Sequence, residues 1–437
     1  MFDSVNEPSF RLDIAGLSDP LEVLAFSGSE GISEPFAFEI DLLINDPQLD
    51  LSSLLYRSAF LQFGPQQNGL NGQLHSLVQQ ELGHGARLCR ARLGPKLSCL
   101  GLRFSQRMFS GYSVPQILVR VLKEHGIRGA QRRLDLRGDY PPQMFCTQYR
   151  ESDLQFVQRL CEQARIHYYF EHGRDGHCLV FSDDPAQWPK AGVAQLDSVG
   201  EQPAVRRWQV ALDARAGSSA QGQTDVPTLR SGQWLAMLGQ PAAERDSHWL
   251  LNRVEHCADT SREPAYSNHI CGTKTPQSTP ARALGRPRMH SLQRAWVVAV
   301  SEPQPDQSRP VAVQFDWLYQ GEGAAASHCW LPLAPALADN PQITLQEGVE
   351  VVVSFLEGDP DQPVISGILQ EAAIDVDADD APGLPENLAS AGFEQWLKSD
   401  EPLLLLCLIP GGGSYNRCTQ PVCSCRMLAA LDQSGAR

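Results

Sequence analysis

Long hydrophobic runs are missing from this chain of 437 residues. A membrane-spanning helix needs about 18 or more consecutive apolar residues, and the longest apolar candidate, residues 403–409, is far shorter. The first residues also lack the basic and apolar segments of a secretory signal peptide. The sequence therefore predicts a protein without a membrane anchor, made in the cytoplasm without a signal peptide.

Positive charge is scarce as well. The chain has 36 Lys and Arg residues against 51 Asp and Glu residues, a formal net charge of −15. Nucleic acids and anionic membranes attract proteins through clustered positive charge. Neither is therefore expected to be the main partner.

Catalytic and nucleotide-binding motifs are missing too. The sequence contains no HExxH, no Walker-type loop, no G-x-G-x-x-G after a strand and no G-x-S-x-G elbow. The segment 411–414 resembles an elbow, but Asn416 stands where glycine is required, and a flexible turn is the interpretation. The sequence predicts no enzyme and no cofactor.

The twelve cysteines are few for a disulfide scaffold of this length. Four of them, including Cys407, lie within 19 residues of the C-terminal part. The zinc candidates are Cys418, Cys423 and Cys425. Zinc ligands usually follow C-x₂₋₄-C spacing, and the single residue between the last two is unusual for two ligands of one ion. Zinc, a redox or disulfide role and no special chemistry stay open, and no metal site is expected.

Two other groups could hold a metal. His167, His172 and His177 recur every five residues across a turn at 173–176, and are interpreted as exposed hairpin histidines without a metal. The acidic residues of segment 357–361 lack the further acidic ligands of an EF-hand loop. They are interpreted as a solvated turn.

The chain does contain segments in which apolar residues alternate with other residues, with a period of two. Phe36, Phe38, Ile40 and Leu42 alternate with other residues, as a strand with one buried face requires. Residues 348–369 predict a strand, a tight acidic turn and a second strand. Five short strands between 295 and 370 suit a small OB-type barrel.

Two helices have complete start signals. Ser113 with Gln116, and Ser152 with Gln155, each form an S-x-x-Q capping box. The fold class is therefore mainly β with an α+β insertion, because helical signals are confined to one stretch. A chain of this length exceeds one ordinary core.

The predicted division has two barrel-like hub domains, the insertion, an OB-fold domain and a short tail. Its boundaries are 1–105 for the first barrel, 106–190 for the insertion, 191–285 for the second barrel, 286–370 for the OB-fold domain, and 371–437 for an acidic linker and cysteine-containing tail.

Two motifs resemble those of a known family. Cys146–Leu154, reading CTQYRESDL, and Ser354–Pro363, reading SFLEGDPDQP, are similar to motifs of the VgrG spike proteins of type VI secretion systems. The family-motif residues are Tyr149, Arg150, Glu151, Ser152, Asp153, Glu357, Gly358, Asp359, Pro360 and Asp361.

The resemblance implies a non-enzymatic homotrimer that caps a hexameric Hcp tube and helps to deliver effectors. It also implies a PAAR-type tip protein or an effector as a possible partner of the tail, and export by the type VI apparatus. The resemblance spans residues 10–370, and no repeats of a β-helical needle follow, so we expect a shortened form.

Three alternatives stay open. The chain could be a phage- or pyocin-derived tail hub or baseplate protein. Its tail could be a small effector or a cargo adaptor. The altered segment 331–341, which replaces a tryptophan- and glycine-rich loop of the family, could also leave a monomeric adaptor that does not assemble.

Overall fold

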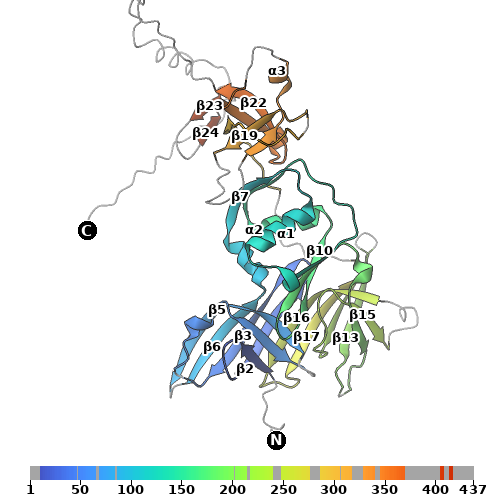
Figure 1. The fold of residues 1–437 in the computed structure, drawn as a ribbon. Helices are drawn as coiled ribbons and strands as arrows, with labels where there is room; N and C mark the ends of the chain where they lie inside the picture. The colour runs from blue at the N-terminus through green and yellow to red at the C-terminus, as the bar shows by residue number, and fades with distance from the viewer. Residues whose placement is uncertain are drawn as a thin grey trace, which may run out of the picture.

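The computed structural model describes residues 10–46, 48–64, 68–83, 86–200, 202–213, 217–239, 248–275, 286–305, 307–316, 328–339, 345–369, 404–407 and 413–416. Figure 1 shows two groups of strands side by side, a layer with two helices above them and a small β unit beyond that layer. The predicted class, mainly β with an α+β insertion, is confirmed.

The first group of strands is a closed six-stranded barrel. Its strands run in the order β1-β4-β5-β6-β3-β2, and pairing of β1 with β2 closes the ring. The bounds are β1 Phe10–Ile14, β2 Leu21–Gly31, β3 Glu34–Ile44, β4 Ser58–Phe63, β5 Gly69–Gly83 and β6 Ala86–Gly94. The predicted alternation on β3 is observed, because Phe36, Phe38, Ile40 and Leu42 are all at most 1% exposed.

The second group continues the same sheet through β2 and β16. It comprises β12 Lys190–Gln195, β13 Val205–Asp213, β14 Gly217–Thr224, β15 Trp234–Leu238, β16 His248–Asp259 and β17 Tyr266–Thr273. The order is β16-β17-β14-β13 on one side and β16-β15-β12 on the other. A single parallel bridge between Leu196 and Val205 joins the two ends, so this half-barrel is nearly closed.

The strand β2 belongs to both groups. Arg11 and Leu12 of β1 pair with its first residues, and residues 253–259 of β16 pair with Ala25–Gly31 on the same edge. Gly28 lies inside β2. A Cβ atom there would come within 2.3 Å of the Phe38 ring, so only glycine fits.

The insertion layer carries the two long helices. Its elements are β7 Phe104–Phe109, α1 Val114–Glu124, β8 Arg132–Asp135, β9 Cys146–Ser152, α2 Asp153–Gln163, β10 His167–His172 and β11 His177–Ser182. Both predicted capping boxes form. Gly126, which follows α1, has a φ of +70°, the left-handed conformation typical just after a helix. The predicted hairpin is β10–β11.

The small β unit has the five predicted strands in a second ring. They are β18 Gln293–Val297, β19 Val311–Phe315, β20 His328–Leu331, β21 Glu350–Phe355 and β22 Pro363–Leu369. The order is β20-β19-β18-β21-β22, and a parallel bridge between Leu333 and Ile365 joins the ends. The OB-type assignment stays a prediction.

Short elements complete the chain. They are the 3-10 helices Leu51–Leu54, Lys96–Leu102, Gly129–Gln131, Pro185–Gln187 and Leu356–Gly358, the helix α3 Pro335–Ala338, and the paired strands β23 Leu404–Cys407 and β24 Gly413–Asn416. Gly413 and Ser414, interpreted as part of a flexible turn, therefore lie in a strand. Within the described residues, no helix has the length and apolarity that crossing a membrane requires.

We predict that Gly28→Ala destabilises the protein by about 1–3 kcal/mol, because the added methyl group collides with the Phe38 ring and the Ala37 carbonyl oxygen. The matched control is Gly192→Ala in β12, where a Cβ atom would meet no atom within 4 Å. Urea denaturation of both variants measures the difference. Equal stability of the two variants would show that β2 tolerates a side chain at its shared segment.

Candidate functional site

The first residue of α2 is a fully buried carboxylate. Asp153 is 0% exposed and follows the cap residue Ser152, whose hydroxyl accepts a hydrogen bond from the Gln155 N–H group. The Gln155 side chain accepts one in return from the Ser152 N–H group, at 2.8 Å. A negative charge at this end of a helix is favoured by the helix dipole.

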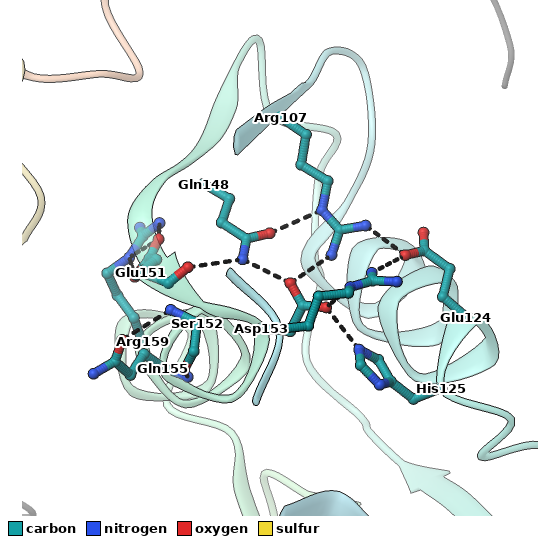
Figure 2. Close-up of polar contacts among 10 residues, drawn as sticks. Arg107, Glu124, His125, Gln148, Glu151, Ser152, Asp153, Gln155 and Arg159 are labelled. Carbon is teal, nitrogen blue, oxygen red and sulfur yellow. Dashed lines mark hydrogen bonds and ion pairs between the residues drawn. The ribbon is translucent and has the colours of Figure 1, made fainter. Parts of the chain in front are cut away.

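Four side chains surround the Asp153 carboxylate (Figure 2). Arg103 Nε and His125 Nε2 lie 2.6 Å from Oδ2, while Gln148 Nε2 and Arg107 donate to Oδ1 at 2.8 Å and 3.1 Å. These partners come from β7 and the residue before it, the end of α1, and β9. One carboxylate therefore ties together the elements that frame the insertion.

A second carboxylate completes this cluster. Glu124, at the end of α1, pairs with Arg103 and, at 2.6 Å, with Arg107. Burial by itself would raise the pKa of Asp153, but hydrogen bonds from His125 and Gln148 and the two arginines outweigh it and lower this pKa. The pKa of Glu124 is lowered for the same kind of reason. Both groups are held ionised and paired, which suits a structural role better than proton transfer.

A separate ion pair lies on the other face of β9. Arg159 of α2 contacts the Glu151 carboxylate at 2.6 Å and donates to the Thr147 carbonyl oxygen at 2.9 Å. Arg159 and Glu151 are both buried. Their pairing fixes β9 against α2 and leaves the Thr147 N–H group and hydroxyl to face another partner.

That partner is the acidic turn of the small barrel. The Thr147 N–H group donates to Asp361 Oδ1 at 2.5 Å, and its hydroxyl donates to the Pro360 carbonyl oxygen at 2.8 Å. The two residues Thr147 and Asp361 are 214 positions apart in sequence. The structure thus brings the turn 357–361 against the strand that carries Tyr149–Ser152. We call this contact the junction.

Apolar packing strengthens the junction. Phe145 and Tyr149, at 5% and 7% exposure, belong to the hydrophobic core of the small barrel, with Met108 packed against it. The Arg150 guanidinium lies 5.1 Å from the centre of the Tyr149 ring, and Arg150 has a φ of +51°. The insertion therefore supplies aromatic side chains to a core otherwise built by β18–β22.

The interpretation of segment 357–361 as a solvated turn is wrong for part of it. Gly358 and Pro360 are buried, and burial raises the pKa of Asp361 despite the hydrogen bond from Thr147. Asp359 accepts from the Asp361 N–H group at 3.0 Å, which shapes the turn. Glu357 alone of these residues is exposed, with a φ of +54°.

The interpretation of three exposed histidines is also wrong. The His172 side chain is 3% exposed. His167 and His177 are half-buried, and burial lowers the pKa of His177 to about 4. The reason is that the β10–β11 hairpin packs onto the first barrel, with His172 and His177 against the Phe36 ring.

No metal centre is found in the part of the chain that the structure describes, where no three His, Cys, Asp or Glu side chains form a group that could hold an ion. The candidates Cys418, Cys423 and Cys425 lie outside the described residues.

Comparisons with known proteins agree with this architecture. Residues 29–221 match the family model of the phage tail baseplate hub (GPD). Over 95% of its length the chain is 32% identical to the type VI secretion system spike protein VgrG4b of Pseudomonas aeruginosa, and equally identical to VgrG5 of the same organism. Nearly the whole chain is thus similar in sequence to VgrG spike proteins. It spans 61% and 62% of the lengths of these two VgrG relatives.

A solved structure shows the same fold. The Escherichia coli c3393 protein, described as a component of the type VI secretion system similar in structure to the T4 phage tail proteins gp27 and gp5, aligns with a TM-score of 0.69. The identity is 23%, and the alignment covers 82% of this chain and 99% of c3393. The shared fold therefore extends beyond the residues that match the hub model.

Sequence reasoning missed the partners of the motif residues. Arg103, Arg107, Glu124, His125 and Arg159 are single charged residues without a recognisable spacing. Only the fold assembles them around β9 and α2. The sequence identified both motifs, but neither the burial of Asp361 nor the contact between the motifs was predicted.

We predict that Asp153→Asn lowers the free energy of unfolding by about 3–5 kcal/mol, because it leaves Arg103, Arg107 and His125 around an uncharged amide. Since the pKa of Asp153 is lowered, the wild-type carboxylate stabilises above its ordinary value of 3.8, and this contribution is lost as the pH falls through the lowered value. Chemical denaturation at pH 7 and pH 3 measures both effects.

The control for Asp153 is Asp175→Asn at the exposed tip of the β10–β11 hairpin, with an expected change within about 0.5 kcal/mol. A similar loss for both variants at pH 7 would contradict the assignment of Asp153 as the centre of the cluster.

We predict that Thr147→Val weakens the junction by about 1–3 kcal/mol, because the buried Pro360 carbonyl oxygen loses its hydrogen-bond donor while the side-chain shape is kept. Thr147→Ser keeps the hydroxyl and is the matched control. Hydrogen exchange of residues 350–369 reports the loss. Greater exchange in the serine variant than in the valine variant would contradict the role of the hydroxyl.

Proposed function

We propose that this protein is a non-enzymatic spike or hub component of a type VI secretion system, a homotrimer that caps an Hcp-type tube and helps to deliver effectors. The observation that carries the proposal is the junction, where Thr147 receives the turn of Pro360 and Asp361. It holds a small barrel rigidly on a phage-hub fold, as a load-transmitting spike requires. The 32% identity to VgrG4b and VgrG5 supports the same role.

The charged side chains next to the junction support a structural role. Both carboxylates of the Asp153 cluster, and that of Glu151, are engaged by arginine or histidine side chains at short distances. Catalysis needs a nucleophile or a base that can reach a substrate. The carboxylates of this region are instead paired with neighbouring arginine and histidine side chains.

The trimer is supported by the fold. The second group of strands is joined to itself by one bridge, between Leu196 and Val205, and large apolar side chains such as Val193 and Leu238 are 64% and 61% exposed on β12 and β15. A symmetric assembly would cover such surfaces. We retain the division at 1–105, 106–190, 191–285, 286–370 and 371–437, with an OB-type fourth domain, as part of the proposal.

The remaining partners follow from the same proposal. Export would proceed through the type VI apparatus from the bacterial cytoplasm, and a PAAR-type tip protein or an effector would meet the C-terminal segment. The second candidate is a phage- or pyocin-type tail hub, which the match of residues 29–221 to the phage tail baseplate hub favours.

We predict that light scattering of the purified chain at micromolar concentration gives three times the 48.1 kDa of one chain. Immobilised protein should then retain an Hcp-type tube protein from the same genome, and not a phage tail tube protein. The reverse preference would establish the phage-type hub. A particle of one chain that retains neither tube protein would overturn the proposal and favour the monomeric adaptor.

A further inference from the structure

The tip of the β10–β11 hairpin rests on the first barrel through a histidine. His172 Nδ1 accepts a hydrogen bond from the Asn71 N–H group of β5 at 3.3 Å. The Asn71 amide donates in return to the Arg174 carbonyl oxygen at 3.1 Å. The His172 ring also packs 5.0 Å from the Phe36 ring. These contacts link the insertion to the barrel at the hairpin tip.

Behind His172 lies a buried carboxylate. Glu30 of β2 is 2% exposed. His256 Nε2 lies 2.9 Å and Arg230 Nε 3.7 Å from Glu30 Oε1, whereas His172 Nε2 is 3.9 Å from Oε2. Glu30 therefore has one permanent cation, Arg230, and two titratable neighbours from different parts of the fold.

The hydrogen bonds of His256 define it as neutral. Because Nε2 faces the Glu30 carboxylate, Nε2 carries the proton. Nδ1 then accepts from the Tyr266 hydroxyl at 2.6 Å, and that hydroxyl oxygen accepts from the Asn268 amide at 3.0 Å. A second proton on His256 would break this chain, so His256 resists protonation.

His172 is in a different position. Its Nδ1 atom accepts a backbone hydrogen bond, so a second proton would have to displace the Asn71 N–H group. The new charge would lie beside Arg230, His177 and His256, with the Glu30 carboxylate as its one acidic neighbour. Protonation of His172 thus removes the hydrogen bond that joins β10 to β5 and adds a charge to a buried cluster.

Solvent reaches this tip through a hollow of about 670 Å³ between the first barrel and the insertion. The hollow is lined by residues of both parts, among them Asn71, His172, Arg174 and His177. A proton can therefore enter at the hairpin tip without unfolding of either barrel.

We propose that His172, with His177 beside it, is a proton-sensitive latch that releases the β10–β11 hairpin tip from the first barrel in mild acid. The barrels themselves stay joined, because backbone pairing of β2 with β16 extends along residues 25–31 and does not involve the His172 side chain. This inference does not depend on the oligomeric state or on the tube protein.

The direction of the pH effect follows from the pKa values. Burial, then the charges of His177 and Arg230, lower the pKa of His172 well below its ordinary value of 6.5, and burial lowers that of His177 to about 4. The released tip regains the ordinary value. It therefore binds more protons than the latched tip below pH 6.5, and the latch weakens as the pH falls from 6.5 toward 4.

Hydrogen exchange of the full chain at about pH 7.5 and about pH 5, corrected for intrinsic exchange rates, tests the latch. In the wild type we expect protection of residues 69–73 and 168–178 to fall at least about tenfold at the lower pH, which corresponds to about 1.4 kcal/mol. Strands β18–β22 should be unchanged. Uniform loss of protection in all strands, or no loss at the hairpin, would overturn the proposal.

The decisive variant is His172→Asn, whose Oδ1 atom can accept the Asn71 N–H bond but does not titrate. We expect it to reduce the acid response, and the double variant His172→Asn/His177→Asn to abolish most of it. The control is His167→Asn on the same strand, a half-buried histidine whose ring faces Trp188 rather than Glu30. It should keep the response. A full acid response that persists in the double variant contradicts the latch, and if this variant loses the exchange pattern at the higher pH, the wild-type comparison decides alone.

Discussion

The structure depends on one shared strand. A strand has only two edges, and β2 uses one of them entirely for β3. Its other edge is divided between β1, which closes the first barrel, and β16, which begins the second group of strands. Backbone hydrogen bonds join β2 both to β1 and to β16. The two groups of strands therefore cannot move apart without breaking the sheet. The glycine at position 28 allows the Phe38 ring to fill the core beneath this shared segment.

The insertion transmits this rigidity to the small barrel. Its strand β9 is held on one face by the Asp153 cluster and on the other by the Glu151–Arg159 pair. Burying these charges costs several kcal/mol per ion, and close pairing with hydrogen bonds offsets that cost. The result is a strand of defined geometry that can present Thr147 to the acidic turn. The strand that these ion pairs hold rigid is thus also the one that connects the insertion to the small barrel.

The hairpin tip of the insertion differs from the junction in its electrostatics. Next to the junction, Asp153 and Glu151 are paired with arginines, which stay protonated at any physiological pH. At the tip, Glu30 faces two histidines and Arg230 over distances up to 3.9 Å. The histidines at the tip can gain charge in mild acid, whereas these arginines keep theirs. The two contacts of the insertion differ in pH dependence for this reason.

Much of the local structure followed from sequence. Alternation identified β3 and the strands of the small barrel, and the capping boxes at Ser113 and Ser152 placed both helices. The burial of His172 and Asp361 was not predicted, because an isolated polar residue beside a turn is usually solvated. Their burial depends on surfaces contributed by the first barrel and the insertion, which are distant in the chain.

The sequence by itself determined the fold class, the helices of the insertion and the two motifs, since these depend on local periodicity and on hydrogen bonds within a few residues. Only the tertiary structure decided that the motifs touch, that β2 is shared and that Glu30 lies among histidines. Contacts between residues 214 positions apart, such as Thr147 and Asp361, have no local pattern. They form because the insertion packs against the small barrel, which brings these two distant segments together.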